Sequence, residues 1–252
     1  MIATINQDDK KFIVDFSRPI DISRAVEKKG VKAWGVNEPV FEPVKIGKWI
    51  GEVKQGGSVN FRNVFFNPHG HGTHTECVGH ISSEDYSINK CLNKFMFFSK
   101  LISVSPQNIY GDAVVTKSAL SLLIREEFCE ALIIRTSGKR KKNKTENYTN
   151  TNPPFIHEDG IRFLLKKGVN HLLIDSPSVD RESDNGKLLA HHAFWEYPQN
   201  TKQFRTITEL IKVPASVKDG YYLLSLQVAP FENDAAPSRP VLYKLKTELL
   251  KK

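Results

Sequence analysis

The sequence predicts an α/β fold with a mixed, partly parallel sheet. Between residues 112 and 195, apolar strand-like segments alternate with helix-like segments, and this alternation is typical of strands that run parallel. The chain has 252 residues, of which 40% are hydrophobic and 25% are charged, which suits a globular unit with a sizeable core. No internal repeat or clean linker interrupts it, so we expect a single domain over residues 1–252.

The first half of the chain contains three predicted strands. "KFIVDFS" (11–17) is apolar and partly β-branched, and polar residues and a proline follow it. "RNVFFNP" (62–68) is a short strand that leads into a histidine-rich segment, and "KFMFFSKLISVSP" (94–106) is a strand that stops at its proline. No helix is predicted between these three strands, so they give no evidence of a parallel pairing.

The second half alternates between the two kinds of element. We expect a short strand from residue 112, a helix at 117–128, a strand at 131–137, a helix at 157–168, a strand at 169–175, a helix at 187–195, and strands at 206–213 and 220–230. The helix at 157–168 has acids at its start, lysines at its end and Gly168 as its expected C-cap. This order of elements predicts the partly parallel sheet.

The positive charge of the chain is local. The net charge is +8, and five of the positive charges lie in "KRKKNK" (139–144), without which the net charge falls to +3. The run sits in a polar stretch with no hydrophobic periodicity, so we expect a solvated insertion loop at 139–152. A nucleic-acid site in this loop is the alternative hypothesis. We predict no nucleic-acid partner.

The sequence also predicts a cytoplasmic protein that has no membrane partner. No apolar run approaches the roughly 18 residues that a membrane helix needs, and the N-terminus lacks a secretory signal pattern. The three cysteines, Cys77, Cys91 and Cys129, form no CxxC pair, which fits a reducing compartment. We expect Cys77 to be a small buried residue.

The segment "NPHGHGTHTECVGHI" (67–81) contains four of the eight histidines of the chain and one acid, Glu76. Its glycines and Pro68 predict a loop over residues 67–80. Imidazole and carboxylate together suit Zn²⁺, Mn²⁺ or Fe²⁺. His74 and Glu76 are two residues apart, so an extended backbone directs both the same way, and His80 keeps that parity. The segment predicts a metal site.

A second segment can complete the site. "DSPSVDRESDNGKLLAHHAFW" (175–195) carries Asp175, Asp180, His191 and His192 directly after a predicted strand, and α/β folds place ligands at the carboxyl ends of strands. Neighbouring helical residues point about 100° apart, so only one of the two histidines is expected to face the site.

These motifs resemble those of the metal-dependent cyclase-like hydrolases, a family that includes bacterial kynurenine formamidase and isatin hydrolase. The hallmark H-x-G-T-H-x-D-x-P-x-H is similar to "GTHTECVGH" at its glycine, threonine and last two histidines. Other segments resemble the family's in the same order: "VDFSRPI", "LIIRTS", "IDSPSVD", "TITELIKVP" and "APSRPVLY". The resemblance covers almost the whole chain.

The resemblance implies a swivelling β/β/α domain that assembles as a homodimer or homotetramer. It implies one or two divalent ions, with zinc as the first candidate and manganese as the second. It also implies roles for individual residues: His69, His74, Glu76, His191 and Glu209 as metal ligands, His80 as general acid and base, and Trp34 as a contact to substrate. Core packing is the alternative for Trp34, and a plain strand carboxylate is the alternative for Glu209.

The chain departs from the family pattern near these residues. His69 to His74 is one residue longer than H-x-G-T-H, and Gly70 occupies the strict register, so His69 or His71 must take its place; Pro68-His69 favours His69. Glu76 replaces an aspartate, and Val78 replaces a proline. The spacing from His191 to Glu209 is longer than the family implies, and His192 rivals His191.

The function implied is hydrolysis of an amide or cyclic amide, a small-molecule substrate, with N-formylkynurenine as the best single candidate. A divalent ion lowers the pKa of bound water from 15.7 towards about 7, which provides a nucleophile at neutral pH. His80 would transfer protons between the nucleophile and the leaving nitrogen. The alternative is a member of the same fold that binds a metal or a small acid without catalysis.

Overall fold

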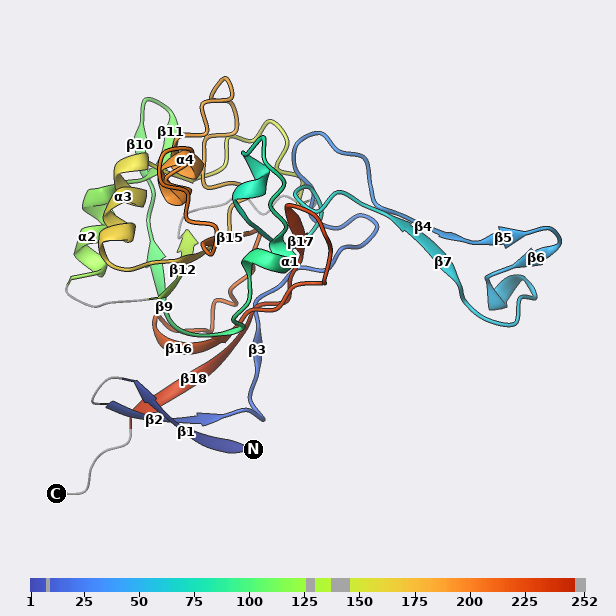
Figure 1. Cartoon of the computed structure of the whole chain (residues 1–252), viewed down its shortest axis with the longest axis horizontal. Helices are drawn as coiled ribbons and strands as arrows, with labels where there is room; N and C mark the ends of the chain where they lie inside the picture. The colour runs from blue at the N-terminus through green and yellow to red at the C-terminus, as the bar shows by residue number, and fades with distance from the viewer. Residues whose placement is uncertain (8–9, 126–129, 137–145, 248–252) are drawn as a thin grey trace.

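A computed structural model describes residues 1–7, 10–125, 130–136 and 146–247. An 11-stranded mixed sheet forms its centre (Figure 1). In spatial order the main path is β1 (Ile2–Gln7), β2 (Lys10–Asp15), β18 (Val241–Thr247), β16 (Gly220–Ser225), β9 (Met96–Val104), β12 (Ala131–Thr136), β14 (His171–Ile174), β15 (Thr206–Glu209), β8 (His74–Glu76) and β17 (Ala235–Pro237). The short strand β3 (Ile20–Asp21) pairs with β18.

The four central strands β9, β12, β14 and β15 run parallel, as the alternation of strands and helices predicts. The two inner strands, β12 and β14, contain near-continuous apolar runs, as expected where both faces of a sheet are buried. Leu132 and Ile134 on β12 belong to one hydrophobic core, and Ala131 and Ile133 belong to the core on the opposite face. The mixed, partly parallel sheet is therefore confirmed.

Three helices cover one face of this centre: α2 (Lys117–Leu123), α3 (Glu158–Lys166) and α4 (Leu189–Trp195). Helix α3 has the expected ends, with His157 at its N-cap and Gly168 in the left-handed region (φ +83°) just beyond its C-cap. The predicted helix at 117–128 is too long. Ile124 adopts an extended backbone and buries its side chain in the core, which ends the helix at Leu123; residues 126–128 lie outside the described residues.

The two predicted C-terminal strands are also shorter than expected. The strand at 206–213 ends at Glu209, because Leu210 has a positive φ (+56°) and Ile211 instead donates to the carbonyl of Ile174. The strand at 220–230 ends at Ser225. The early turn after Glu209 leaves its carboxylate at the end of a parallel strand, where α/β folds place functional groups.

An arm projects from the body of the molecule between residues 40 and 65 (Figure 1). It contains the pairs β4 (Val40–Pro43) with β7 (Arg62–Phe65) and β5 (Lys45–Ile46) with β6 (Trp49–Ile50). The strand predicted at 62–68 is β7, and it ends at Phe65. Several apolar side chains of the arm are exposed, among them Ile46, Phe61 and Phe65.

Two further sequence predictions concern membrane-spanning helices and the basic loop. None of the helices in the described ranges combines the length and the apolar character needed to cross a bilayer. Residues 139–145, half of the basic loop predicted at 139–152, lie outside the described residues. In its remaining part, Asn147 forms a parallel bridge with Lys32, which ties the end of the loop to the first half of the chain.

Candidate metal centre

The histidine-rich loop begins with a compact turn at Asn67. The side chain of Asn67 accepts from the backbone N–H of Gly70 at 2.9 Å, and its backbone carbonyl accepts from that of His71 at 3.0 Å. Gly72 adopts φ +77°, and a Cβ there would lie 2.9 Å from the carbonyl oxygen of Arg24, so only glycine fits. This turn separates the directions of His69 and His71.

His71 forms hydrogen bonds to backbone groups and does not join the cluster of candidate metal ligands. Its Nδ1 accepts from the backbone N–H of Asn67 at 2.9 Å, and its Nε2 donates to the carbonyl of Asn37 at 2.7 Å. Both ring nitrogens are therefore occupied by backbone. His69 points the other way, with its Nδ1 3.1 Å from Oε2 of Glu76. The structure thus brings His69, and not His71, to the candidate site.

Strand β8 directs His74 and Glu76 to the same side, as their spacing predicts. Both side chains are fully buried, and Nδ1 of His74 donates to the carbonyl of Gly72 at 3.3 Å. Thr75, between them, points to the opposite side and bonds Thr208 of β15. In the antiparallel pairing of these strands, Glu209 lies opposite His74 and its Oε2 is 3.5 Å from His74 Nε2.

Helix α4 brings His191 into the cluster. Nε2 of His191 lies 3.1 Å from Oε1 of Glu76, and its Nδ1 donates to Oδ2 of Asp180 at 2.6 Å. Asp180 also accepts from the backbone N–H groups of Ala190 and His191, so this one carboxylate fixes both the start of α4 and the imidazole. His192 faces away and donates to the carbonyl of Tyr197.

His80 reaches the cluster through a 3-10 turn (Val78–His80) and not through the continued strand parity that its spacing from Glu76 suggests. Its ring stacks on that of His69 with 4.2 Å between centroids, and its Nε2 is 3.9 Å from Oε2 of Glu76. The side chain of His80 is 31% exposed, whereas those of His74 and Glu76 are fully buried. His80 therefore lies on the open side of the cluster.

Asp234, which we did not single out from the sequence, also lies in the cluster. Its Oδ2 accepts from Nε2 of His69 at 2.8 Å and is 3.4 Å from Nδ1 of His80. The residue precedes the three-residue strand β17, which is too short to show periodicity. Only its position before the "APSRP" segment marks it in the sequence. Asp175, a predicted candidate, instead accepts from Thr136.

The carboxylates and imidazoles of the cluster stabilise each other's charged forms. Burial opposes charge on His69, but the hydrogen bond that it donates to Asp234 and the negative charges of Asp234 and Glu76 raise the pKa of its imidazole to about 10. Burial likewise opposes charge on His191, but the hydrogen bonds that its ring donates to Asp180 and Glu76 raise its pKa well above the ordinary value. The facing histidines lower the pKa of Glu76 despite its complete burial. The metal-free cluster thus holds protons that a cation can replace.

The residues present fit a divalent cation. Four buried side-chain polar atoms of the described residues form no well-directed hydrogen bond, and two of them face this cluster. They are Oε2 of Glu76, which lies 3.1 Å from Nδ1 of His69, and Nε2 of His74, which lies 3.5 Å from Oε2 of Glu209. Buried polar atoms are normally paired, so such atoms call for an explanation. Ligand atoms of His69, His74 and Glu76 lie within 4.8 Å of one another, as do those of Glu76, His80 and His191. Imidazole and carboxylate donors at this spacing suit zinc or manganese.

Trp34 lies outside this cluster. It is 39% exposed, has φ +61°, and lines an open hollow with residues such as Thr149 and Arg181. Its neighbour Ala33 donates to the carbonyl of Gly70, which links Trp34 to the histidine-rich loop through backbone. The structure gives no contact between Trp34 and the described cluster residues, so its contact to substrate stays a prediction.

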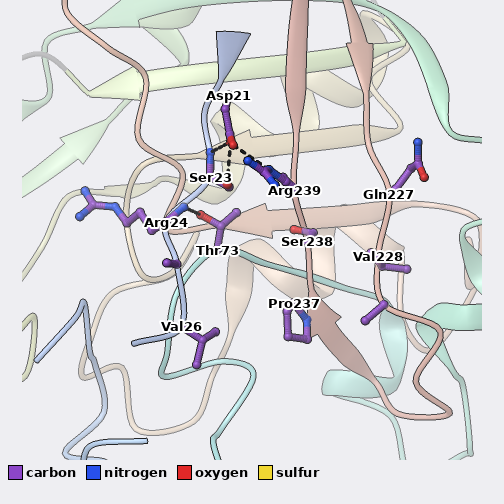
Figure 2. A pocket seen from close by; sticks show the side chains of 12 residues that line it. Asp21, Ser23, Arg24, Val26, Thr73, Gln227, Val228, Pro237, Ser238 and Arg239 are labelled. Carbon is purple, nitrogen blue, oxygen red and sulfur yellow. Dashed lines mark hydrogen bonds and ion pairs between the residues drawn. The ribbon is translucent and has the colours of Figure 1, made fainter. Parts of the chain in front are cut away.

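A hollow of about 640 Å³ lies beside the cluster without including its ligands (Figure 2). It shares Thr73 with the histidine-rich loop, and the described residues that line it include none of the six predicted metal and catalytic residues. Figure 2 shows Asp21 paired with Arg239 and Ser23 at its rim. The chemistry-bearing groups are therefore gathered in the buried cluster and not in this larger hollow.

Comparisons with known proteins agree with this geometry. The chain is 28% identical to a kynurenine formamidase of Bacillus cytotoxicus over 228 aligned residues. The alignment covers 90% of this chain and 97% of the relative. A kynurenine formamidase of Bacillus anthracis is 26% identical over 227 residues, with 90% and 97% covered.

Solved structures share the fold. One of a potential metal-dependent hydrolase with cyclase activity matches with a TM-score of 0.64 and 17% identity, covering 90% of this chain and 97% of that one. Isatin hydrolase A from Labrenzia aggregata matches with a TM-score of 0.64 and 13% identity, covering 90% and 93%. Residues 20–181, well over half of the chain, match the family described as "Putative cyclase". The chain belongs to this cyclase family.

Proposed function

We propose that the protein is a metal-dependent hydrolase that cleaves the carbon–nitrogen bond of an amide or cyclic amide. The observation that carries this proposal is the buried group of His74, Glu76 and Glu209, in which Nε2 of His74 and Oε2 of Glu76 form no well-directed hydrogen bond although other ligand-type side chains lie within 3.5 Å of each. The curated relatives, which are kynurenine formamidases, support the same class of reaction.

We assign the metal ligands as His69, His74, Glu76, His191 and Glu209. Glu76 is shared by the group that contains His69 and His74 and the group that contains His80 and His191. Zinc is the expected metal, as one or two ions, and manganese is the alternative. When bound, the ion supplies Lewis acidity that activates water and polarises the substrate carbonyl. Glu209 is held for this role because its other oxygen accepts from the backbone N–H of Val179 at 2.9 Å.

We assign proton transfer to His80. Its imidazole is partly exposed, stacks on His69 and lies within 3.9 Å of Glu76, so it borders the space where a substrate carbonyl would lie. From there it would take a proton from the attacking water and give one to the leaving nitrogen. Cleavage of a formamide then yields a free amine and formate.

N-formylkynurenine, which would give kynurenine and formate, is the first substrate to test. The support is the sequence similarity to kynurenine formamidases over 90% of the chain. Trp34 is our candidate for the contact to an aromatic substrate, since it is partly exposed and one residue from Ala33, which bonds the histidine-rich loop. Its replacement by alanine should raise KM for an aromatic formamide more than for formamide itself.

The proposal is tested by measuring the metal content of the purified protein and then screening substrates. His74→Ala should lose both metal and activity, while His192→Ala, a matched change in a histidine that faces away, should keep both. Bound metal without turnover of formamides, lactams, lactones or esters would favour a non-catalytic binding protein. A wild-type protein that takes up no divalent metal would overturn the proposal.

We further propose a homodimer or homotetramer in the cytoplasm. The exposed apolar side chains of the arm, such as Ile46 and Phe61, support self-association, because an isolated two-stranded ribbon is marginally stable in water. The free, buried thiols of Cys77 and Cys91 support a reducing compartment. Sedimentation analysis of the purified chain tests the oligomeric state.

A further inference from the structure

Asp234 is held in place by a loop that is anchored to the histidine-rich segment. Its backbone carbonyl accepts from the N–H of Cys77 at 3.0 Å, and the carbonyl of Asn233 accepts from Ile88 at 2.8 Å. Ala235, the next residue, pairs with Glu76 in the antiparallel ladder of β17 and β8. A Cβ at Gly79 would lie 3.2 Å from that of Asp234, so the glycine lets the loop approach closely.

The carboxylate of Asp234 touches two imidazoles of the cluster through one oxygen. Its Oδ2 is 2.8 Å from Nε2 of His69 and 3.4 Å from Nδ1 of His80. Both rings present their other nitrogen to Glu76, at 3.1 Å for Nδ1 of His69 and 3.9 Å for Nε2 of His80. Each ring therefore has one nitrogen on Glu76 and the other on Asp234.

The same arrangement recurs at the other ligand histidines. Nδ1 of His191 donates to Asp180 at 2.6 Å while its Nε2 faces Glu76. Nδ1 of His74 donates to the carbonyl of Gly72, which leaves its Nε2 free. A ligand histidine generally donates its second N–H to a carboxylate or carbonyl, which fixes the tautomer and the orientation of the ring. Asp234 supplies to His69 what Asp180 supplies to His191.

We propose that Asp234 is a positioning residue that orients both the ligand His69 and the proton-transferring His80 by accepting their outward N–H groups. This proposal rests on the proposed function, because it takes the roles of these two histidines from it. It links the ion and the proton carrier through one carboxylate, so that the stacked imidazoles keep a common orientation towards Glu76.

Ligand atoms of His69, His80 and Asp234 also lie within 4.8 Å of one another, but the contacts of Asp234 favour the positioning role over that of a metal ligand. The 2.8 Å between Oδ2 of Asp234 and Nε2 of His69 is the length of a direct hydrogen bond. Oε2 of Glu76 lies 3.1 Å from Nδ1, on the other side of the His69 ring from Asp234. An ion held by Glu76 and Nδ1 of His69 would leave Nε2 of His69 to donate to Asp234.

The test compares Asp234→Ala, Asp234→Asn and Asp234→Glu with Glu232→Gln, a matched change in an exposed acid of the same loop. The readouts are zinc stoichiometry, zinc affinity of the metal-free protein by competition with a chromophoric chelator, and kcat and KM with saturating zinc. Circular dichroism and thermal unfolding establish that each variant is folded. If Asp234→Ala fails to fold, the near-isosteric Asp234→Asn carries the comparison.

We expect Asp234→Ala to keep the zinc stoichiometry of the wild type, lower zinc affinity by roughly 10- to 100-fold and lower kcat with little change in KM. Asp234→Asn keeps a neutral acceptor and should fall between alanine and wild type, and Asp234→Glu should restore part of the loss. Glu232→Gln should match the wild type. These results are expected only if the carboxylate acts through the two histidines.

Two outcomes would overturn the proposal. Loss of one equivalent of zinc from Asp234→Ala or Asp234→Asn would make Asp234 a ligand. Unchanged zinc affinity and kcat in a folded variant would leave it without a role. The affinity measurement needs no substrate, so a wild type that binds zinc but hydrolyses no amide would contradict the proposed function while still testing the orientation of His69.

Discussion

Glu209 on β15 lies directly opposite His74 on β8, with 3.5 Å between Oε2 and Nε2. The two residues are far apart in the sequence, and the antiparallel register of their strands brings them together in the interior. Such a pair has little freedom to separate, because each strand is also hydrogen-bonded on its other edge, β15 to β14 and β8 to β17. The register of the sheet therefore sets the width of the proposed ion site.

Glu209→Gln should weaken metal binding without unfolding the protein. The amide keeps the shape of the side chain and an oxygen that can accept from the N–H of Val179, but it removes the negative charge opposite His74. We expect zinc affinity to fall by at least roughly 100-fold, since loss of a ligand should exceed the effect of losing an outer partner. Chelator competition measures this, and wild-type affinity in the variant would contradict the assignment of Glu209.

His80→Ala should keep the metal and lose rate. His80 is on the open side of the cluster, and general acid–base groups contribute roughly 10²- to 10⁴-fold to the rate. We expect kcat for the best substrate in the screen to fall within that range, with metal content unchanged by elemental analysis. If the variant lost its metal as His74→Ala is expected to do, His80 would be a ligand instead.

Metal binding should release about two protons near neutral pH. Carboxylates raise the pKa of His69 to about 10 and that of His191 well above its usual value, so both imidazoles are protonated in the metal-free protein at pH 7.5. Each must lose a proton to become a ligand, so affinity should rise with pH up to about 10. Calorimetry in buffers of different ionisation enthalpy counts the protons; enthalpies that do not depend on the buffer would refute the prediction.

His171 should make the protein sensitive to acid. Burial, together with the charge of Lys94, lowers the pKa of its imidazole to about 3, and the ring bonds Thr206 and packs on Phe97. The unfolded chain takes up a proton near pH 6.5 and the folded chain does not. The folded state therefore loses stability as the pH falls from 6.5 towards 3.

A comparison with His171→Gln isolates this effect, because other titrating groups are shared. Between pH 7 and pH 4.5, the wild type should lose about 3 kcal/mol more unfolding free energy than the variant. Denaturant titrations of the metal-free proteins at the two pH values provide the measurement. Equal losses would mean that His171 becomes protonated in the folded protein.

The sequence predicts the centre of the fold better than its edges. The alternation of strands and helices between residues 112 and 195 predicts parallel strands there, and the apolar runs of β12 and β14 are buried as this arrangement requires. The spacing of His74 and Glu76 correctly gives their common direction on β8. The lengths of α2 and β15 depend instead on where Ile124 and Leu210 turn into the core, and a tertiary contact of this kind leaves no local pattern.

In the candidate site too, local sequence predicts some features, and tertiary contacts decide the others. A local motif marks His69, His74, Glu76 and His80, but the choice of His69 over His71 depends on backbone partners that come from Asn37 and Asn67. Asp234 is contributed by a loop 165 residues from His69, next to a strand too short to show alternation. Its role depends on sheet register, and the register follows only from the assembled fold.

The main-chain pairing of β8 on both edges also bears on how the protein is made. The strand that carries His74 and Glu76 is bonded to β15 and β17 through backbone groups, which need no ion to form. Internal ion pairs such as Asp180 with His191 also hold the cluster together. We therefore expect the polypeptide to fold before it binds its metal, so that the ion can be removed and replaced without unfolding the chain.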